Sequence, residues 1–131
     1  MKNITFIPKK VVLLLHEELI GRYRGCSGVR DIKLPDSALA QPKATFGDNY
    51  LHDDIFKMAG AYGYQLCNNP PFVDGNKRIA MVAMEIFLHK NGYDIIAPEK
   101  ETYSTIIKLS SNQLDKKALT KWLVDNKAPT D

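Results

Sequence analysis

The chain has 131 residues, a formal net charge of +3 at pH 7 and a hydrophobic content of 44%. These values are ordinary for a globular protein, and we expect a single domain over residues 1–131. The charge is small and the basic and acidic residues are interspersed, so direct nucleic-acid binding is not indicated. The sequence has neither an apolar run of membrane-spanning length nor a signal-peptide pattern, so a cytoplasmic location is expected.

The first predicted element is a helix that begins near Pro8 and is closed by Gly25. Its apolar stripe consists of Val11, Val12, Leu14, Leu15, Leu19 and Tyr23. Residues 26–50 contain several glycines and prolines, and they are predicted as loop with one short helical turn from Asp36 to Ala40.

A second main helix is predicted to begin at Asp53 or Asp54, either of which can act as the N-cap. Its core-facing residues at helical spacing are Ile55, Met58, Ala59, Tyr62 and Leu66. This helix must stop near Asn69, because the consecutive prolines Pro70 and Pro71 cannot continue it.

A third helix, over residues 79–89, is apolar nearly all round and is therefore expected to run through the middle of the structure. Asn91 and Gly92 provide its C-cap. The extended segment 93–96 is expected to pair with residues 4–7.

Two further helices are predicted near the end of the chain. One begins at Pro98 and the other spans about Asn112 to Asp125; their packing residues are Tyr103, Ile106, Ile107, Leu109, Leu114, Leu119, Trp122 and Leu123. The predicted fold class is therefore all-α: a compact helical bundle with a buried central helix and a minor short β pairing. Cys26 and Cys67 are expected to be free thiols.

The segment Pro70–Arg78 is the candidate functional site. Residues 75–78 fall at the N-terminus of the buried helix, where free backbone N–H groups and the helix dipole attract anions. Gly75 would let the backbone approach a phosphate, Lys77 and Arg78 would add positive charge, and Asp74 could hold Mg²⁺ bound to the same phosphates. Asp-Gly and Gly-Asn are also common turn dipeptides, so spacing alone favours a solvated loop between two helices.

The longer pattern Phe-x-Asp-Gly-Asn-Lys-Arg between two helices resembles the central motif of the Fic/Doc family. Lys77 stands where most Fic proteins have glycine, and this is similar to the Doc (death-on-curing) branch. The likeness extends to the segment 15–25, which resembles the first helix and glycine turn of Doc-like proteins, and to Asn91-Gly92-Tyr93. It covers roughly residues 4 to 126.

The resemblance implies a toxin of a toxin–antitoxin module that transfers phosphate from ATP to a hydroxyl of elongation factor Tu and so arrests translation. It implies ATP and Mg²⁺ at the site, with Asp74 on the metal, Gly75 beside the nucleotide and Asn76, Lys77 and Arg78 in both nucleotide binding and catalysis. A Phd-like antitoxin is the implied partner. Transfer of AMP, the reaction of most Fic proteins, is the alternative chemistry.

One position departs from the family pattern. The motif opens with a histidine two residues before the Phe, which serves as general base, but this chain has Pro70 there. Proline cannot accept a proton, and general base catalysis typically contributes about 10²- to 10⁴-fold, so we expect the chain to be inactive or strongly impaired. Pro70 is either an inactivating change or the mark of a natural pseudo-enzyme that still binds nucleotide or antitoxin; rescue by His16, His52 or His89 is the remaining alternative.

Overall fold

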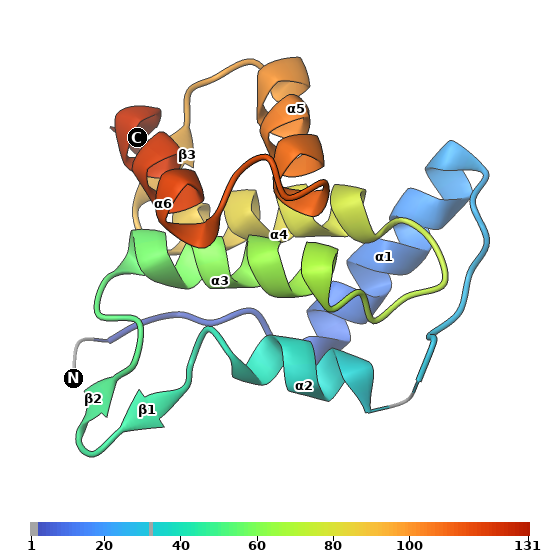
Figure 1. Ribbon diagram of the computed structural model, residues 1–131, viewed down its shortest axis with the longest axis horizontal. Helices are drawn as coiled ribbons and strands as arrows, with labels where there is room; N and C mark the ends of the chain where they lie inside the picture. The colour runs from blue at the N-terminus through green and yellow to red at the C-terminus, as the bar shows by residue number, and fades with distance from the viewer. Residues whose placement is uncertain (1–2, 32) are drawn as a thin grey trace.

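Two adjacent helices, α3 (Ile55–Asn68) and α4 (Asn76–Lys90), lie at the centre of the computed structural model, which describes residues 3–31 and 33–131 (Figure 1). Asp54 is the N-cap of α3, where its side chain accepts a hydrogen bond from the Lys57 amide at 2.8 Å. Gly63 lets the two helices approach closely, because a Cβ there would come within 2.6 Å of the Met84 sulfur. The predicted capping of the second helix and its end near Asn69 are confirmed.

The core is built mainly on α3 and α4. The predicted core residues of α3 are buried, except that Ile55 is half-buried. The buried residues of α4 are Ile79, Ala80, Met81, Ala83, Met84, Phe87 and Leu88. The expectation of a central, almost wholly apolar helix is therefore confirmed.

Helix α1 (Lys9–Tyr23) packs on this core through a narrower face than the sequence suggested. Its buried residues, Val12, His16 and Ile20, are four residues apart and form a single row. Leu14 of the predicted stripe is 62% exposed, because it lies outside this row.

The region 26–50 contains more regular structure than predicted. Helix α2 spans Leu34–Ala40, two residues longer at its start than expected. It is followed by a small antiparallel hairpin of β1 (Thr45–Phe46) and β2 (Asn49–Tyr50). Figure 1 shows this hairpin near the N-terminal end of α3, far from the α3–α4 loop.

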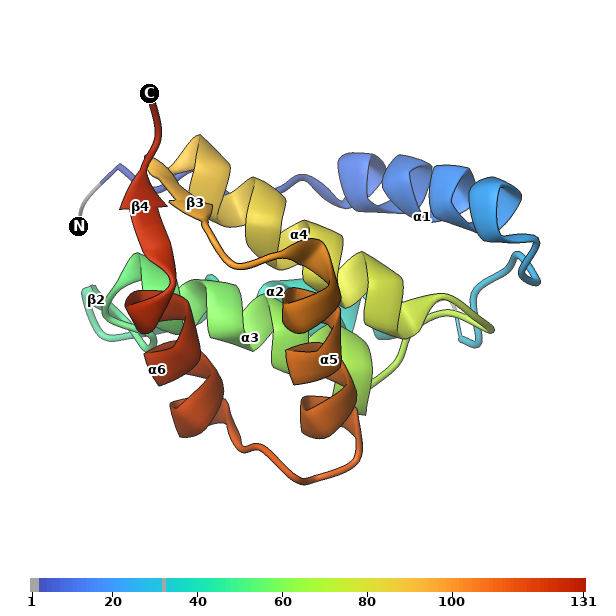
Figure 2. The ribbon, with the colours of Figure 1, turned by 90° about the horizontal axis from the view of Figure 1, so that it is seen from above.

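The C-terminal part consists of β3 (Tyr93–Ile95), α5 (Glu99–Ser110), α6 (Lys116–Asp125) and β4 (Lys127–Pro129). Figure 2 shows α5 and α6 lying across α3 and α4. The last helix begins later than predicted, because Asp115 caps it by accepting a hydrogen bond from the Ala118 amide at 2.8 Å.

The predicted pairing of residues 93–96 with residues 4–7 is wrong. Strand β3 pairs antiparallel with β4, from the end of the chain. The N-terminal segment is instead held by Asn91, whose side chain exchanges hydrogen bonds with the N–H and C=O of Thr5 at 2.9 Å each. The expected fold class, all-α with minor β pairing, is nevertheless confirmed.

Across the described residues, no helix combines the length and the apolar character needed to cross a membrane. Cys26 and Cys67 are both free thiols, as predicted.

Candidate functional site

The loop between α3 and α4 is anchored by Phe72, which is 1% exposed. Its ring stacks on the imidazole of His16, with ring centroids 3.6 Å apart and planes 9° from parallel. His16 Nε2 also donates a hydrogen bond to the Asp74 carbonyl oxygen at 2.7 Å. Through these two contacts of His16, helix α1 fixes the position of the loop.

Asn76 closes the loop onto the start of α4. Its side-chain oxygen accepts a hydrogen bond from the Phe72 N–H, and its side-chain nitrogen donates to the Phe72 carbonyl, both at 3.0 Å. These bonds engage both ends of the side-chain amide. The direct contribution of Asn76 to a ligand would therefore come from its backbone N–H, while its side chain shapes the loop.

A strand-like segment runs along the other side of the loop. Gly28 O accepts a hydrogen bond from the Val73 N–H at 3.0 Å, and Arg30 N–H donates to the Pro71 carbonyl at 2.9 Å. The guanidinium of Arg30 adds a bond to the Pro70 carbonyl at 3.0 Å. This is the part of the region 26–50 that lies beside the motif.

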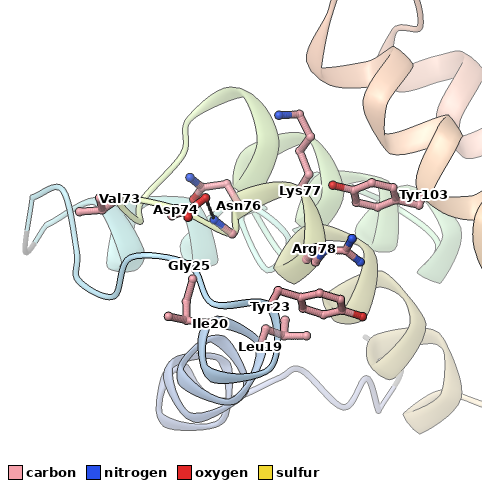
Figure 3. Close-up of a pocket in the computed structure, with 11 residues that line it drawn as sticks. Leu19, Ile20, Tyr23, Gly25, Val73, Asp74, Asn76, Lys77, Arg78 and Tyr103 are labelled. Atoms are coloured by element: carbon pink, nitrogen blue, oxygen red, sulfur yellow. Dashed lines mark hydrogen bonds between the residues drawn. The ribbon is translucent and has the colours of Figure 1, made fainter.

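The loop and the start of α4 form one side of a cavity of about 510 Å³. Figure 3 shows the residues around it, which come from α1, the two loops, α4 and α5. They are Leu19, Ile20, Tyr23, Gly25, Val73, Asp74, Gly75, Asn76, Lys77, Arg78 and Tyr103. The structure thus brings together five of the six site residues predicted from the sequence.

The N-terminus of α4 presents free donors to this cavity. The first intrahelical bond runs from the Ile79 amide to the Gly75 carbonyl at 3.0 Å, and no side chain caps the helix. The amides of residues 76–78 therefore precede the bonded part of the helix, and they carry the positive end of its dipole. Gly75 has φ of 78°, a left-handed conformation that glycine adopts without strain.

Asp74 is the acidic residue of the cavity. Its carboxylate accepts hydrogen bonds from the amides of Cys26, at 3.2 Å, and Gly75, at 2.8 Å. These two bonds lower the pKa of Asp74 below its usual value, so the group is ionised at neutral pH. The remaining lone pairs of an ionised carboxylate suit a divalent cation that arrives already bound to phosphates.

Asp74 by itself does not make a metal site. Within the described part of the chain, no three His, Cys, Asp or Glu side chains are grouped as metal ligands. Mg²⁺ typically binds through one or two carboxylates, substrate phosphates and water. The donor set fits Mg²⁺ only when phosphate oxygens complete the coordination.

Gly25 shapes the cavity where α1 ends. A Cβ at this position would lie 2.7 Å from Asp74 Oδ2 and 2.9 Å from the Ile20 Cδ1 atom. The carboxylate of Asp74 therefore has its position because residue 25 has no side chain.

The two basic residues of the motif differ in their surroundings. Lys77 is exposed, and Figure 3 shows its side chain reaching away from Arg78. Arg78 is half-buried, with Cζ 3.8 Å from the ring centroid of Tyr23 and 4.7 Å from that of Tyr103.

Pro70, the sixth predicted site residue, does not line the cavity. None of the three histidines lines the cavity. His16 lies against the loop, but it is 1% exposed and its Nε2–H donates a hydrogen bond to the Asp74 carbonyl oxygen. His52 lines a separate cavity with Lys57 and Lys116, and His89 pairs with Asp94 at the opposite end of α4.

Sequence reasoning missed several residues that build the site. Tyr23 and Tyr103 were assigned to helix packing, and Arg30, although part of a segment that resembles the family, was assigned no role at the site. Helical periodicity cannot reveal such residues, because their role depends on the meeting of segments that are far apart in the sequence. The family likeness over residues 15–25 was the one signal that pointed to the end of α1.

Comparison with known proteins finds a family and relatives that resemble this chain. The Fic/DOC family matches residues 6–88. Over 69 residues the chain is 41% identical to Toxin Doc of Mycolicibacterium smegmatis, a match that covers 53% of each protein. Over 94 residues it is 27% identical to Protein kinase doc of Escherichia phage P1, covering 71% of this chain and 74% of the phage protein.

The chain thus spans about half the length of the first of these relatives and about three quarters of the second. The family match includes the loop and most of α4, and it extends over more than half of the chain. The relatives' names point to the Doc branch, as the lysine in the motif suggested. The chain belongs to the Fic/DOC family.

Proposed function

We propose that this protein is a Doc-type toxin scaffold whose cavity binds Mg·ATP for transfer of the γ-phosphate to a protein hydroxyl. The observation that carries the proposal is that the free amides of residues 76–78, Lys77, Arg78 and Asp74 all border one cavity. The relatives named Toxin Doc and Protein kinase doc favour this chemistry over others that use a phosphate site.

In this mechanism the residues of the chain position and neutralise the phosphates. The helix amides donate hydrogen bonds to phosphate oxygens, and Lys77 and Arg78 offset the charge that moves during transfer. Asp74 would hold the Mg²⁺, which would neutralise phosphate charge when bound. Gly75 lets the loop lie close to α1, since a Cβ there would come within 3.0 Å of Ile20 Cδ1 and 3.4 Å of His16 Nε2.

The target and the partner are proposed on the family resemblance. We expect the acceptor hydroxyl to belong to elongation factor Tu, so that the reaction arrests translation. We expect neutralisation by a Phd-like antitoxin, whose segment would order on the toxin surface as it binds.

Pro70 would leave this scaffold without its general base. The residue stands where the family has a histidine, and the geometry supports no substitute among the described residues. His16 is committed to the loop, while His52 and His89 do not line the cavity. The chain as it stands would bind nucleotide but transfer phosphate slowly or not at all.

Two alternatives remain. A non-catalytic pseudo-enzyme that binds nucleotide or antitoxin is favoured by Pro70 itself. A Fic-type AMP transferase would use the same cavity with the α-phosphate at the reacting position. Lys77 favours γ-phosphate transfer, because its side chain occupies the position where the AMP-transferring members have glycine.

The test is label transfer from ATP to purified elongation factor Tu. ATP labelled at the α- or γ-phosphate is incubated with the native chain, the Pro70→His variant and the double variant Pro70→His, Asp74→Asn. We expect γ-label to be transferred by Pro70→His, about 10²- to 10⁴-fold less by the native chain, and little by the double variant.

Transfer of α-label instead would establish the AMP transferase. Absence of transfer from either position by Pro70→His would overturn the kinase proposal for this target. The pseudo-enzyme alternative would then be the better account if Mg·ATP still bound.

A further inference from the structure

Arg78 is held between two tyrosine rings that come from distant parts of the chain. Its Cζ atom lies 3.8 Å from the ring centroid of Tyr23 and 4.7 Å from that of Tyr103. Tyr23 is the last residue of α1, and Tyr103 lies in α5. Figure 3 shows the guanidinium between the two rings at the edge of the cavity.

In the part of the chain that the structure describes, no oxygen atom accepts a hydrogen bond from this guanidinium. Among the described residues, the arginine side chains that donate to protein oxygen atoms are Arg22, to Glu18, and Arg30, to Pro70. A half-buried guanidinium with five N–H donors and no protein acceptor is suited to bind an anion.

Stacking and anion binding are compatible for an arginine. Aromatic rings contact the faces of the planar guanidinium, whereas its N–H donors lie in the plane and point outward from its edge. The rings can therefore fix the orientation of Arg78 without occupying a donor. The two rings also restrict the rotamers of the long Arg78 side chain in the free protein. Ligand binding then costs less side-chain entropy, because part of that freedom is already lost.

We propose that Tyr23 and Tyr103 form an aromatic clamp, a pair of positioning residues that orient Arg78 toward a polyphosphate before it binds. The identity of the natural ligand, ATP, rests on the proposed function, but the clamp acts on any polyphosphate anion. Tyr103 lies beyond residues 6–88, so a segment outside the family match contributes to the site.

The test compares leucine and phenylalanine at both positions. Binding of inorganic tripolyphosphate and of Mg·ATP is measured by calorimetry for Tyr23→Leu, Tyr103→Leu, Tyr23→Phe and Tyr103→Phe. Each leucine variant should bind both ligands about 2- to 5-fold more weakly, the factor expected for one exposed cation–π contact. The phenylalanine variants should bind like the native chain, because they keep the ring face.

Tyr64→Leu is the matched control. Tyr64 has the Lys116 ammonium 4.6 Å from its ring centroid but does not line the cavity, so its loss should leave both affinities unchanged. Thermal unfolding identifies any variant that fails to fold. The NMR shift of the Arg78 Nε–H in the free native chain gives a second readout, which should show the ring-current displacement of a stacked guanidinium.

Each outcome decides between the two proposals. Leucine variants that bind both ligands like the native chain, phenylalanine variants as weak as leucine, or an undisplaced Arg78 shift would overturn the clamp and leave the proposed function standing. Clamp-dependent binding of tripolyphosphate without binding of Mg·ATP would support the clamp and contradict the proposed function. Failure of the native chain to bind either ligand would overturn both.

Discussion

At the residue scale, the site depends on a few close contacts around Asp74. The short spacing of Asp74, Gly75, Lys77 and Arg78 indicates that they lie close together, because a loop that enters a helix places them within one turn, and all four line the same cavity. The contact of Gly25 with Asp74 could not be predicted in this way, since it joins segments about fifty residues apart. Contacts between segments far apart in the sequence are the part of the site that could not be predicted from the sequence.

Gly25→Ala is expected to displace the Asp74 carboxylate. The added Cβ would lie 2.7 Å from Asp74 Oδ2, and this flexible side chain would move rather than the backbone. Calorimetry should therefore find Mg·ATP bound about tenfold more weakly, with little change in the melting temperature.

Gly21→Ala, four residues earlier in α1, is the matched control. A Cβ at residue 21 would meet no atom within 4 Å, so Mg·ATP affinity should not change. The substitution should stabilise the fold by about 0.5–1 kcal/mol, because alanine favours the helix over glycine. An unchanged affinity in Gly25→Ala would contradict the role given to Gly25.

The two cysteines are expected to differ in reactivity. Burial raises the pKa of the Cys67 thiol to about 12, whereas Cys26 is exposed. Because the thiolate is the reactive form, iodoacetamide at pH 8 should modify Cys26 first and Cys67 only after unfolding. Mass spectrometry of the iodoacetamide-treated Cys26→Ser variant, which retains only Cys67, checks this. Rapid labelling of Cys67 in the folded variant would contradict the prediction.

At the element scale, the sequence predicted the helices better than the strands. Periodicity and capping residues identify α3, α4 and α5, because a helix is stabilised by contacts between near neighbours in the sequence. The partner of β3 was mispredicted because a short strand carries no signal that says which distant segment it pairs with. The same limit concealed the hairpin of β1 and β2.

Helix α4 contains one half-buried acid, Glu85, which should cost stability at neutral pH. Burial, and to a lesser extent Glu99, raise the pKa of Glu85 above its usual value. A carboxyl group with a raised pKa in the folded state destabilises the fold above that pKa, and this cost disappears as the pH falls below the unfolded-state value.

Glu85→Gln should therefore raise the melting temperature by about 2 °C at pH 7, the effect of about 0.5 kcal/mol after screening by water. The difference from the native chain should vanish near pH 3, where Glu85 is protonated in both states. Glu17→Gln, at an exposed position of α1, is the control and should change little at either pH. A lower melting temperature for Glu85→Gln at pH 7 would contradict this account.

At the scale of the whole molecule, the cavity is made where the end of α1, the start of α4 and the side of α5 meet. The bundle supplies rigid elements for every proposed phosphate contact, and Pro70 changes none of the residues that line the cavity. Phosphate binding and phosphate transfer should therefore be separable in this protein. We expect the native chain to bind nucleotide, and we expect phosphate transfer to be impaired because Pro70 stands at the position proposed for the general base.

The most direct test of this claim is the Mg²⁺ dependence of ATP binding, measured by calorimetry on the native chain, Asp74→Asn and the exposed hairpin control Asp48→Asn. We predict that the native chain and Asp48→Asn bind ATP more tightly with Mg²⁺ than with EDTA, and that Asp74→Asn loses this difference. An absence of ATP binding by the native chain, or equal Mg²⁺ dependence in Asp74→Asn, would contradict the account.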